Sequence, residues 1–334
     1  VMALVLVFRP QGLFQRIQAR KILTMQRLFI SSGLILVLGW VAGAFLPRWL
    51  QFMFTMAMAN GLVSLGIVLL MRGGVVAFGQ GLMAALGGYA AALVFLHWGW
   101  QDALLLPLFG GLVACLLTAP FGPLLARYRG IFFSMLTLAL SMVGYGILVK
   151  TDSVGGSDGF NMGRVTLLGQ TLADQHVSMV LFSVTWLFAV VCSMLAKLYF
   201  SSIRGLVTQA IRDNELRVEY MGGSVANTMA INFSLAAFLG GMGGALAVMA
   251  LGHIDPNFSY WTTSGEFVFL AILAGSQSVL AVMLSSLVLE MVRSFSSAYF
   301  PSTWQLALGL FLLLVIRFLP EGLGSLWTHR KAKP

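Results

Sequence analysis

The chain of 334 residues is 59% hydrophobic and only 9% charged, which excludes an ordinary soluble globular protein. Its mean hydropathy of +0.91 predicts a polytopic membrane protein that is mostly surrounded by lipid. The formal net charge of +9 does not indicate nucleic-acid binding, because the basic residues are scattered between apolar segments. Cys115 and Cys192 lie in apolar runs without a second thiol or histidine at ligand spacing, so neither a disulfide framework nor a metal site is expected.

Basic residues near the two ends predict that both ends are cytoplasmic. Residues 1–27 carry five basic residues and no acidic one, and such an excess marks the cytoplasmic segments of membrane proteins. Residues 328–334 form a second basic segment, with Arg330, Lys331 and Lys333. Residues 28–327 between them are predicted to form the transmembrane domain, and the number of crossings is expected to be even.

Apolar segments of about 20 residues predict the individual crossings. Seven of them are predicted at 28–46, 50–71, 72–100, 103–126, 131–149, 177–198 and 226–251. Repeated glycines from Gly73 to Gly88 predict that the third crossing is broken or kinked. A polar loop at 150–176 is expected on the outer side.

The even count requires two further crossings within 262–292, which meet at the turn-like Gly275–Ser278. A clear last span is predicted at 304–316. The sequence therefore predicts about ten crossings, two of them short, and a re-entrant pair of half-helices at 262–292 is the alternative. Arg293 falls outside the membrane in this arrangement, with Glu290 three residues earlier as its expected partner.

The stretch 201–228 is predicted to be the only long polar helix. Apolar residues recur at helical spacing from Ile203 to Met221, and polar residues occupy the other face. Gly222 and Gly223 are expected to end it. Its charges have both signs, which suits a groove in a soluble protein partner better than lipid headgroups. An amphipathic helix that lies on the membrane surface is the alternative.

The sequence offers little for enzyme chemistry. It contains no GxxxxGK[ST] motif, so the chain cannot hydrolyse ATP by that route. The GGSDG stretch at Gly155–Gly159 lacks the lysine of a phosphate-binding loop and predicts a tight turn. His253 and Asp255 also predict a turn, because no third member of a catalytic or metal-binding group accompanies them. Asp158 and Asp255 are candidates for docking a partner at the outer surface.

Charge is scarce inside the apolar segments, where only Glu266 and Glu290 are acidic. A proton-coupled symporter usually needs more intramembrane ionisable groups, so the energy for transport is expected to come from outside this chain. Uncharged polar residues are candidates for lining a pathway, although each is equally suited to bonding between helices. These candidates are Asn60, Ser64, Gln80, Ser134, Thr137 and Ser141.

Several stretches, in order along nearly the whole chain, resemble the permease subunits of branched-chain amino-acid ABC importers of the LivM type. They are Gly66–Leu93, Arg129–Ser141, Gly155–Gly159, Ile203–Val225 and Leu319–Leu323. The resemblance implies an all-α polytopic bundle with the type II-like importer permease fold, in which some helices are broken or short. The chain departs from that family in three places. Gly79 and Gln80 stand where the family tends to have glycine and histidine, Ala274–Ser286 lacks a Gly-Pro pair, and Leu6–Phe14 is an extra segment that is similar to the end of a sister permease.

The resemblance also implies partners in a bacterial inner membrane. They are a sister permease, two cytoplasmic ABC ATPases that bind ATP and magnesium, and a periplasmic binding protein. The region 201–225 matches the family's coupling helix, which sits in a cleft of the ATPase. The residues carried over to this role are Arg204, Arg212, Asp213, Asn214, Glu215, Glu219 and Gly222.

The implied function is that of a non-enzymatic permease that imports leucine, isoleucine and valine. Urea, short amides or small carboxylates are alternative substrates, because related importers share this permease design. The rivals from other classes are an ion-coupled secondary transporter or channel and an integral-membrane enzyme. The enzyme would need a clustered site, such as a metal held by His253, Asp255 and Glu266.

Overall fold

The computed structural model describes residues 12–167, 169–171, 176–319 and 322–324. Helices dominate these residues, which confirms the predicted all-α polytopic class. Residues 1–11 of the basic N-terminal segment, most of the extra segment Leu6–Phe14 and the whole basic tail 328–334 lie outside the described residues.

Eight helical segments are long and apolar enough to cross a membrane in the described part of the chain. They are α2 (Gly12–Phe45, apolar from Leu28), α3 (Arg48–Met71), α4 (Gln80–Trp98), α5 with α6 (Leu105–Thr118 and Gly122–Leu125), α7 (Gly130–Lys150), α8 (Val177–Ser201), α11 (Val225–Leu251) and α13 (Val279–Tyr299). Two shorter apolar helices are α12 (Trp261–Ala274) and α14 (Trp304–Phe318). The remaining elements are η1 (Ala119–Phe121), η2 (Asp152–Val154), η3 (Pro256–Ser259), α9 (Ile203–Asp213), α10 (Glu215–Tyr220) and the strands β1 (Phe160–Asn161), β2 (Thr166–Leu167), β3 (Gln170–Thr171) and β4 (His253–Ile254).

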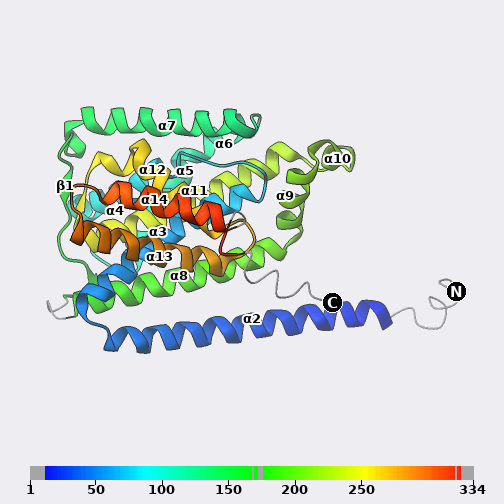
Figure 1. The fold of residues 1–334 in the computed structure, drawn as a ribbon, viewed down its shortest axis with the longest axis horizontal. Helices are drawn as coiled ribbons and strands as arrows, with labels where there is room; N and C mark the ends of the chain where they lie inside the picture. Colours follow the sequence, from blue (N-terminus) through cyan, green and yellow to red (C-terminus); the bar gives the residue numbers. More distant parts are fainter. Residues whose placement is uncertain (1–11, 168, 172–175, 320–321, 325–334) are drawn as a thin grey trace, which may run out of the picture.

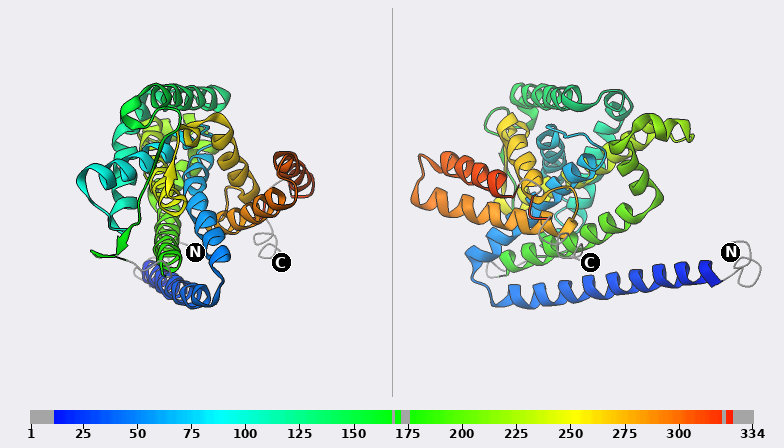
Figure 2. Two further views of the ribbon diagram at one scale, coloured as in Figure 1. Left: turned by 90° about the vertical axis from the view of Figure 1, so that its left-hand side faces the viewer. Right: turned by 45° about the vertical axis from the view of Figure 1, so that its right-hand side comes forward.

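The long helices run side by side, with α7 and α2 on opposite sides of the bundle (Figures 1 and 2). Helices α9 and α10 project from one end, and β1 lies at the other end (Figure 1). Strand β1 pairs with β4, so the segment that follows α7 lies against the segment that follows α11. The turn between α12 and α13 lies at residues 275–278, as predicted, but α13 continues to Tyr299 and is not short. Arg293 lies within α13, and the side of the membrane on which it was placed stays a prediction.

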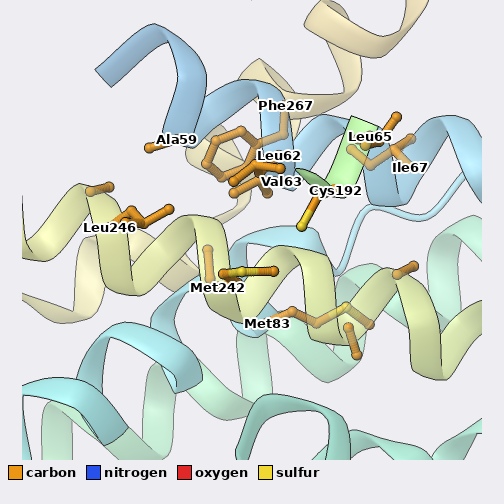
Figure 3. Close-up of a cluster of buried hydrophobic side chains, with 14 of the residues drawn as sticks. Ala59, Leu62, Val63, Leu65, Ile67, Met83, Cys192, Met242, Leu246 and Phe267 are labelled. Carbon is orange, nitrogen blue, oxygen red and sulfur yellow. The ribbon is translucent and has the colours of Figure 1, made fainter. Parts of the chain in front are cut away.

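Helices α3, α4 and α11 form the core of the bundle. Figure 3 shows Leu62 and Val63 of α3 close to Phe267 of α12, above Met242 and Leu246 of α11. Helices α4 and α11 approach each other through small residues, among them the glycine-rich stretch Gly240–Gly244 of α11. A Cβ atom on Gly244 would lie 2.0 Å from the carbonyl oxygen of Ala84, which leaves room for glycine alone.

Two segments without α-helical structure interrupt the succession of helices in this bundle. Residues 72–79 leave α3 in a non-helical conformation and α4 begins only at Gln80, which confirms the predicted break. Residues 252–260 likewise separate α11 from α12. The two new helix starts meet, because the Gly81 amide donates a hydrogen bond to Ser264 Oγ over 3.2 Å.

The close approach of α4 and α11 makes a testable prediction about Gly244. We expect Gly244→Ala to lower the yield of folded protein and its melting temperature in detergent, because the added methyl group would meet rigid backbone and overpacking costs about 1–3 kcal/mol. Gly309→Ala in α14 is the matched control, since nothing lies within 4 Å of its added Cβ. Equal melting temperatures for the two variants would contradict the described packing.

Candidate functional site

The polar region 201–225 forms two short helices, which corrects the prediction of one long helix. The chain leaves helical geometry at Asn214, with φ −163° and ψ 105°, and the Asn214 side chain accepts a hydrogen bond from the Arg217 amide over 3.0 Å. Asparagine is favoured at a helix N-cap because its side chain satisfies a free amide of the first turn. Gly222 ends α10 as predicted, with φ +82°.

The first of these helices, α9, is attached to the bundle by a chain of buried polar groups. The Tyr199 hydroxyl of α8 donates to Asn232 Oδ1 of α11 over 2.5 Å, and Asn232 Nδ2 donates to Thr208 Oγ1 of α9 over 2.9 Å. Asn232 and Thr208 are both buried. Sequence analysis missed this network, although an asparagine inside an apolar span is the kind of residue that bonds between membrane helices.

The predicted coupling residues reach three other parts of the bundle. Arg212 Nη1 donates to Ser276 Oγ, over 3.2 Å, in the turn between α12 and α13. Arg212 also lies against Gly74, at the start of the interruption after α3. Glu215 accepts a hydrogen bond from Arg129, the residue before α7. The helix pair therefore contacts the ends of several helices at once.

The outer face of α9 and α10 is a mixed apolar and charged surface. Large apolar side chains are exposed beside charged ones, and Tyr220 is 89% exposed. The exposed apolar side chains are Ile203, Leu206, Leu216, Tyr220 and Met221, and the exposed charged ones are Arg204, Arg212, Asp213, Arg217 and Glu219. An exposed apolar cluster rimmed by charge is typical of a protein-binding surface.

The three predicted pathway residues of α7 bond to the interrupted segments. Ser134 Oγ donates to the Val76 carbonyl over 2.7 Å, and Thr137 Oγ1 accepts from the Phe78 amide over 3.0 Å. Ser141 Oγ donates to the Ser259 carbonyl over 2.7 Å. Backbone groups outside a helix need such partners at membrane depth, because no water is present to satisfy them.

The other three candidates lie inside the bundle. Gln80 is fully buried, and its Nε2 donates to the Ala236 carbonyl over 2.9 Å. Ser64 Oγ donates to the Phe267 carbonyl over 3.1 Å. Asn60 Nδ2 donates to Glu290 Oε2 over 3.3 Å. All six candidates thus bond between elements, and their role in a pathway stays a prediction.

Arg293 pairs with a different residue from the one predicted. Its Nη1 atom lies 3.3 Å from Glu266 Oε2 of α12, and its guanidinium lies 5.5 Å from the Trp304 ring centre. Glu290, the predicted partner, instead accepts the hydrogen bond from Asn60. The pairing joins α12 to α13, and local spacing on one helix does not reveal it.

The two docking candidates, Asp158 and Asp255, lie on adjacent segments at the end of the molecule opposite α9 and α10. Gly155, Gly156 and Gly159 all have positive φ, so the predicted tight turn is present. Gly159 packs against the backbone of Ile254 and Asp255. Asp158 is exposed, whereas Asp255 uses its carboxylate to accept from the Asn257 amide over 3.1 Å. His253 bonds to Asn161 over 2.8 Å, and no group of three metal-binding side chains occurs among the described residues.

The sequence of this chain is similar to one protein family and to two curated relatives. The family described as "Branched-chain amino acid transport system / permease component" matches residues 50–317. Two curated relatives are the high-affinity branched-chain amino acid transport system permease proteins LivM of Salmonella typhimurium and Escherichia coli. Each is 24% identical over 325 residues, which cover 89% of this chain and 75% of the relative. No solved structure matches this chain significantly.

The bond between Thr137 and the interrupted segment can be tested directly. We expect Thr137→Val to lower the melting temperature of the purified protein, because it leaves the Phe78 amide without an acceptor. An unsatisfied buried donor costs about 1–3 kcal/mol of folding free energy. Thr118→Val is the matched control: Thr118 is equally buried, but its hydroxyl bonds only to Ala114 one turn earlier. If both variants melt alike, the hydrogen bond does not hold the segment.

Proposed function

Because this chain belongs to the family of permease components of branched-chain amino acid transport systems, we propose that it forms one half of the path through which an ABC importer moves leucine, isoleucine and valine. A sister permease forms the other half, two ATPases bind on the cytoplasmic side, and a periplasmic protein delivers the substrate. This chain carries no enzymatic activity of its own and crosses the bacterial inner membrane with both ends inside.

The observation that carries the proposal is the position of α9 and α10. Their outer face offers a mixed apolar and charged surface to a soluble partner, and their inner face contacts α11, the start of α7 and the turn before α13. A partner that shifts these helices therefore acts on several spanning helices together. Such mechanical transfer suits a chain in which few charges lie within the spans.

The pathway in this proposal runs along α7 and the two interrupted segments. Ser134, Thr137 and Ser141 of α7 bond to residues 72–79 and to η3. A shift of α7, whose first turn follows Arg129, changes these bonds and so the position of the helix starts at Gln80 and Trp261. Asp158 and Asp255, on adjacent outer segments, are the proposed contacts for the binding protein.

The substrate assignment rests on the family and on the printed names of the two relatives. The six candidate pathway residues are uncharged, which fits an amino acid with an apolar side chain but also urea, short amides or small carboxylates. The substrate is tested by uptake of labelled leucine, isoleucine and valine into cells that carry the transporter and into cells that lack it. Uptake of urea or acetamide without uptake of these three amino acids would show that the chain belongs to an importer for small amides instead.

The coupling role makes a prediction about charge at the helix pair. We expect Arg212→Glu combined with Glu219→Lys to reduce ATP-driven uptake by at least about tenfold, because the exposed Glu219 charge at the partner surface is reversed and the Arg212 bond to Ser276 is lost. Arg164→Glu with Asp152→Lys in the outer loop is the control with the same charge changes. Uptake and ATPase activity are measured in proteoliposomes that contain the whole transporter.

Unchanged uptake in the Arg212 and Glu219 variant would show that the helix pair does not transmit energy from an ATPase. The alternative function, a secondary transporter, predicts a different result. This chain alone in liposomes would then take up substrate when an ion gradient is applied, without any co-purified ATPase.

A further inference from the structure

A second feature of the molecule lies away from the proposed pathway, on the side covered by α2. Helix α2 is held to α8 at its later turns, where Gly39 packs against the ring of Trp186 and Gly43 against Phe182. Trp186 Nε1 also donates to the Leu36 carbonyl over 3.2 Å. Nearer the start of the apolar part, from Leu28 to Ile35, a groove opens between α2, α8, α3 and α13.

The groove is large and almost entirely apolar. It has a volume of about 340 Å³ and is lined by side chains such as Ile35, Met58, Val190 and Met283. Ser193 also lines it, and the buried Ser193 hydroxyl has no hydrogen-bond partner in the described structure. An apolar groove of this volume between membrane helices suits a hydrocarbon chain.

The groove continues into a second cavity at the end of the bundle that carries α9. This mouth has a volume of about 260 Å³ and shares Lys197, Val279 and Leu280 with the groove. Arg72, Phe200, Ser201, Gln277 and Ser278 complete its lining. The apolar groove therefore opens into a mouth with two cationic side chains.

These cations lack carboxylate partners among the described residues. Lys197 is exposed, and neither of the ion pairs that the described structure contains, Arg129 with Glu215 and Arg293 with Glu266, involves the mouth. The Arg72 guanidinium lies 4.2 Å from the centre of the Phe200 ring and donates to Gln209 over 3.4 Å, while its buried Nε has no acceptor. Burial, and next the nearby Arg212, lower the pKa of Arg72. Both effects mean that an anion at this mouth would be stabilised.

We propose that this groove binds one phospholipid with a net negative headgroup, such as phosphatidylglycerol. An acyl chain lies between α2, α8 and α13, and the phosphate lies at Lys197 and Arg72. Basic pockets between helices on the cytoplasmic side of a membrane are suited to anionic lipid headgroups, because the basic side chains attract the negatively charged phosphate. Charge complementarity at the mouth favours this occupant over a zwitterionic lipid or a protein chain.

The proposal is tested with a photo-cross-linker at Ser31, which lines the groove. The whole transporter, with benzoylphenylalanine in place of Ser31, is placed in vesicles of equal parts phosphatidylglycerol and phosphatidylcholine and illuminated. Mass spectrometry then counts the two lipid adducts. The same group at Leu116, an exposed position on α5, reports on bulk lipid.

We expect an excess of phosphatidylglycerol at position 31 on the order of tenfold, and roughly equal adducts at position 116. Lys197→Gln should reduce the excess by about fivefold, whereas Lys150→Gln at the far end of α7 should leave it unchanged. Equal adducts at position 31, or an excess that survives Lys197→Gln, would overturn the proposal. Attachment of position 31 to another protein chain would overturn it too, because a partner subunit would then cover the groove.

Discussion

The need to satisfy backbone polar groups away from water shapes this molecule. Two segments, 72–79 and 252–260, leave α-helical geometry before α4 and α12, and a membrane offers no water to bond their amides and carbonyls. Side chains supply hydrogen-bond partners instead of water. Thr137 of α7 accepts from the Phe78 amide, and Ser264 of α12 accepts from the Gly81 amide in the first turn of α4. In this conformation α7 and α12 supply hydrogen-bond partners to the irregular segments and to the helix start that follows the first of them.

The same constraint explains how the two ends of the molecule are connected. The interruption after α3 begins at Arg72 and Gly74, against α9, and finishes at Gln80, where it meets the start of α12. Helix α12 in turn ends at the turn that Arg212 contacts through Ser276. A continuous series of contacts therefore joins the α9–α10 helix pair at one end of the bundle to its centre, through residues 72–80 and again through α12.

The sequence predicted those features that depend on local composition. Apolar length located the spans, repeated glycine located the break after Met71, and Gly222 located the end of α10. It did not predict the break at Asn214, because asparagine is tolerated within a polar helix and acts as a cap only when the chain turns there. The pairing of Arg293 with Glu266 joins different helices, and helical spacing pointed instead to Glu290. The six pathway candidates all bond between elements, but composition gave no sign of which carbonyl, amide or carboxylate each would meet, and their role in a pathway stays a prediction.

The distribution of close contacts indicates which parts of the bundle are able to move. Helices α4 and α11 meet backbone to backbone at Gly87 with Gly241 and at Gly244 with Ala84, so any sliding between them creates clashes. Helix α7 is different, because its exposed side chains are numerous and it is joined to the centre mainly through hydroxyl groups and a few packed rings. Hydrogen bonds of serine and threonine are individually weak between membrane helices, on the order of 1 kcal/mol. Exchange of such bonds costs far less than a break in the glycine contact, so the motion of transport is expected in α7 and the interrupted segments, while α3, α4 and α11 serve as the fixed frame.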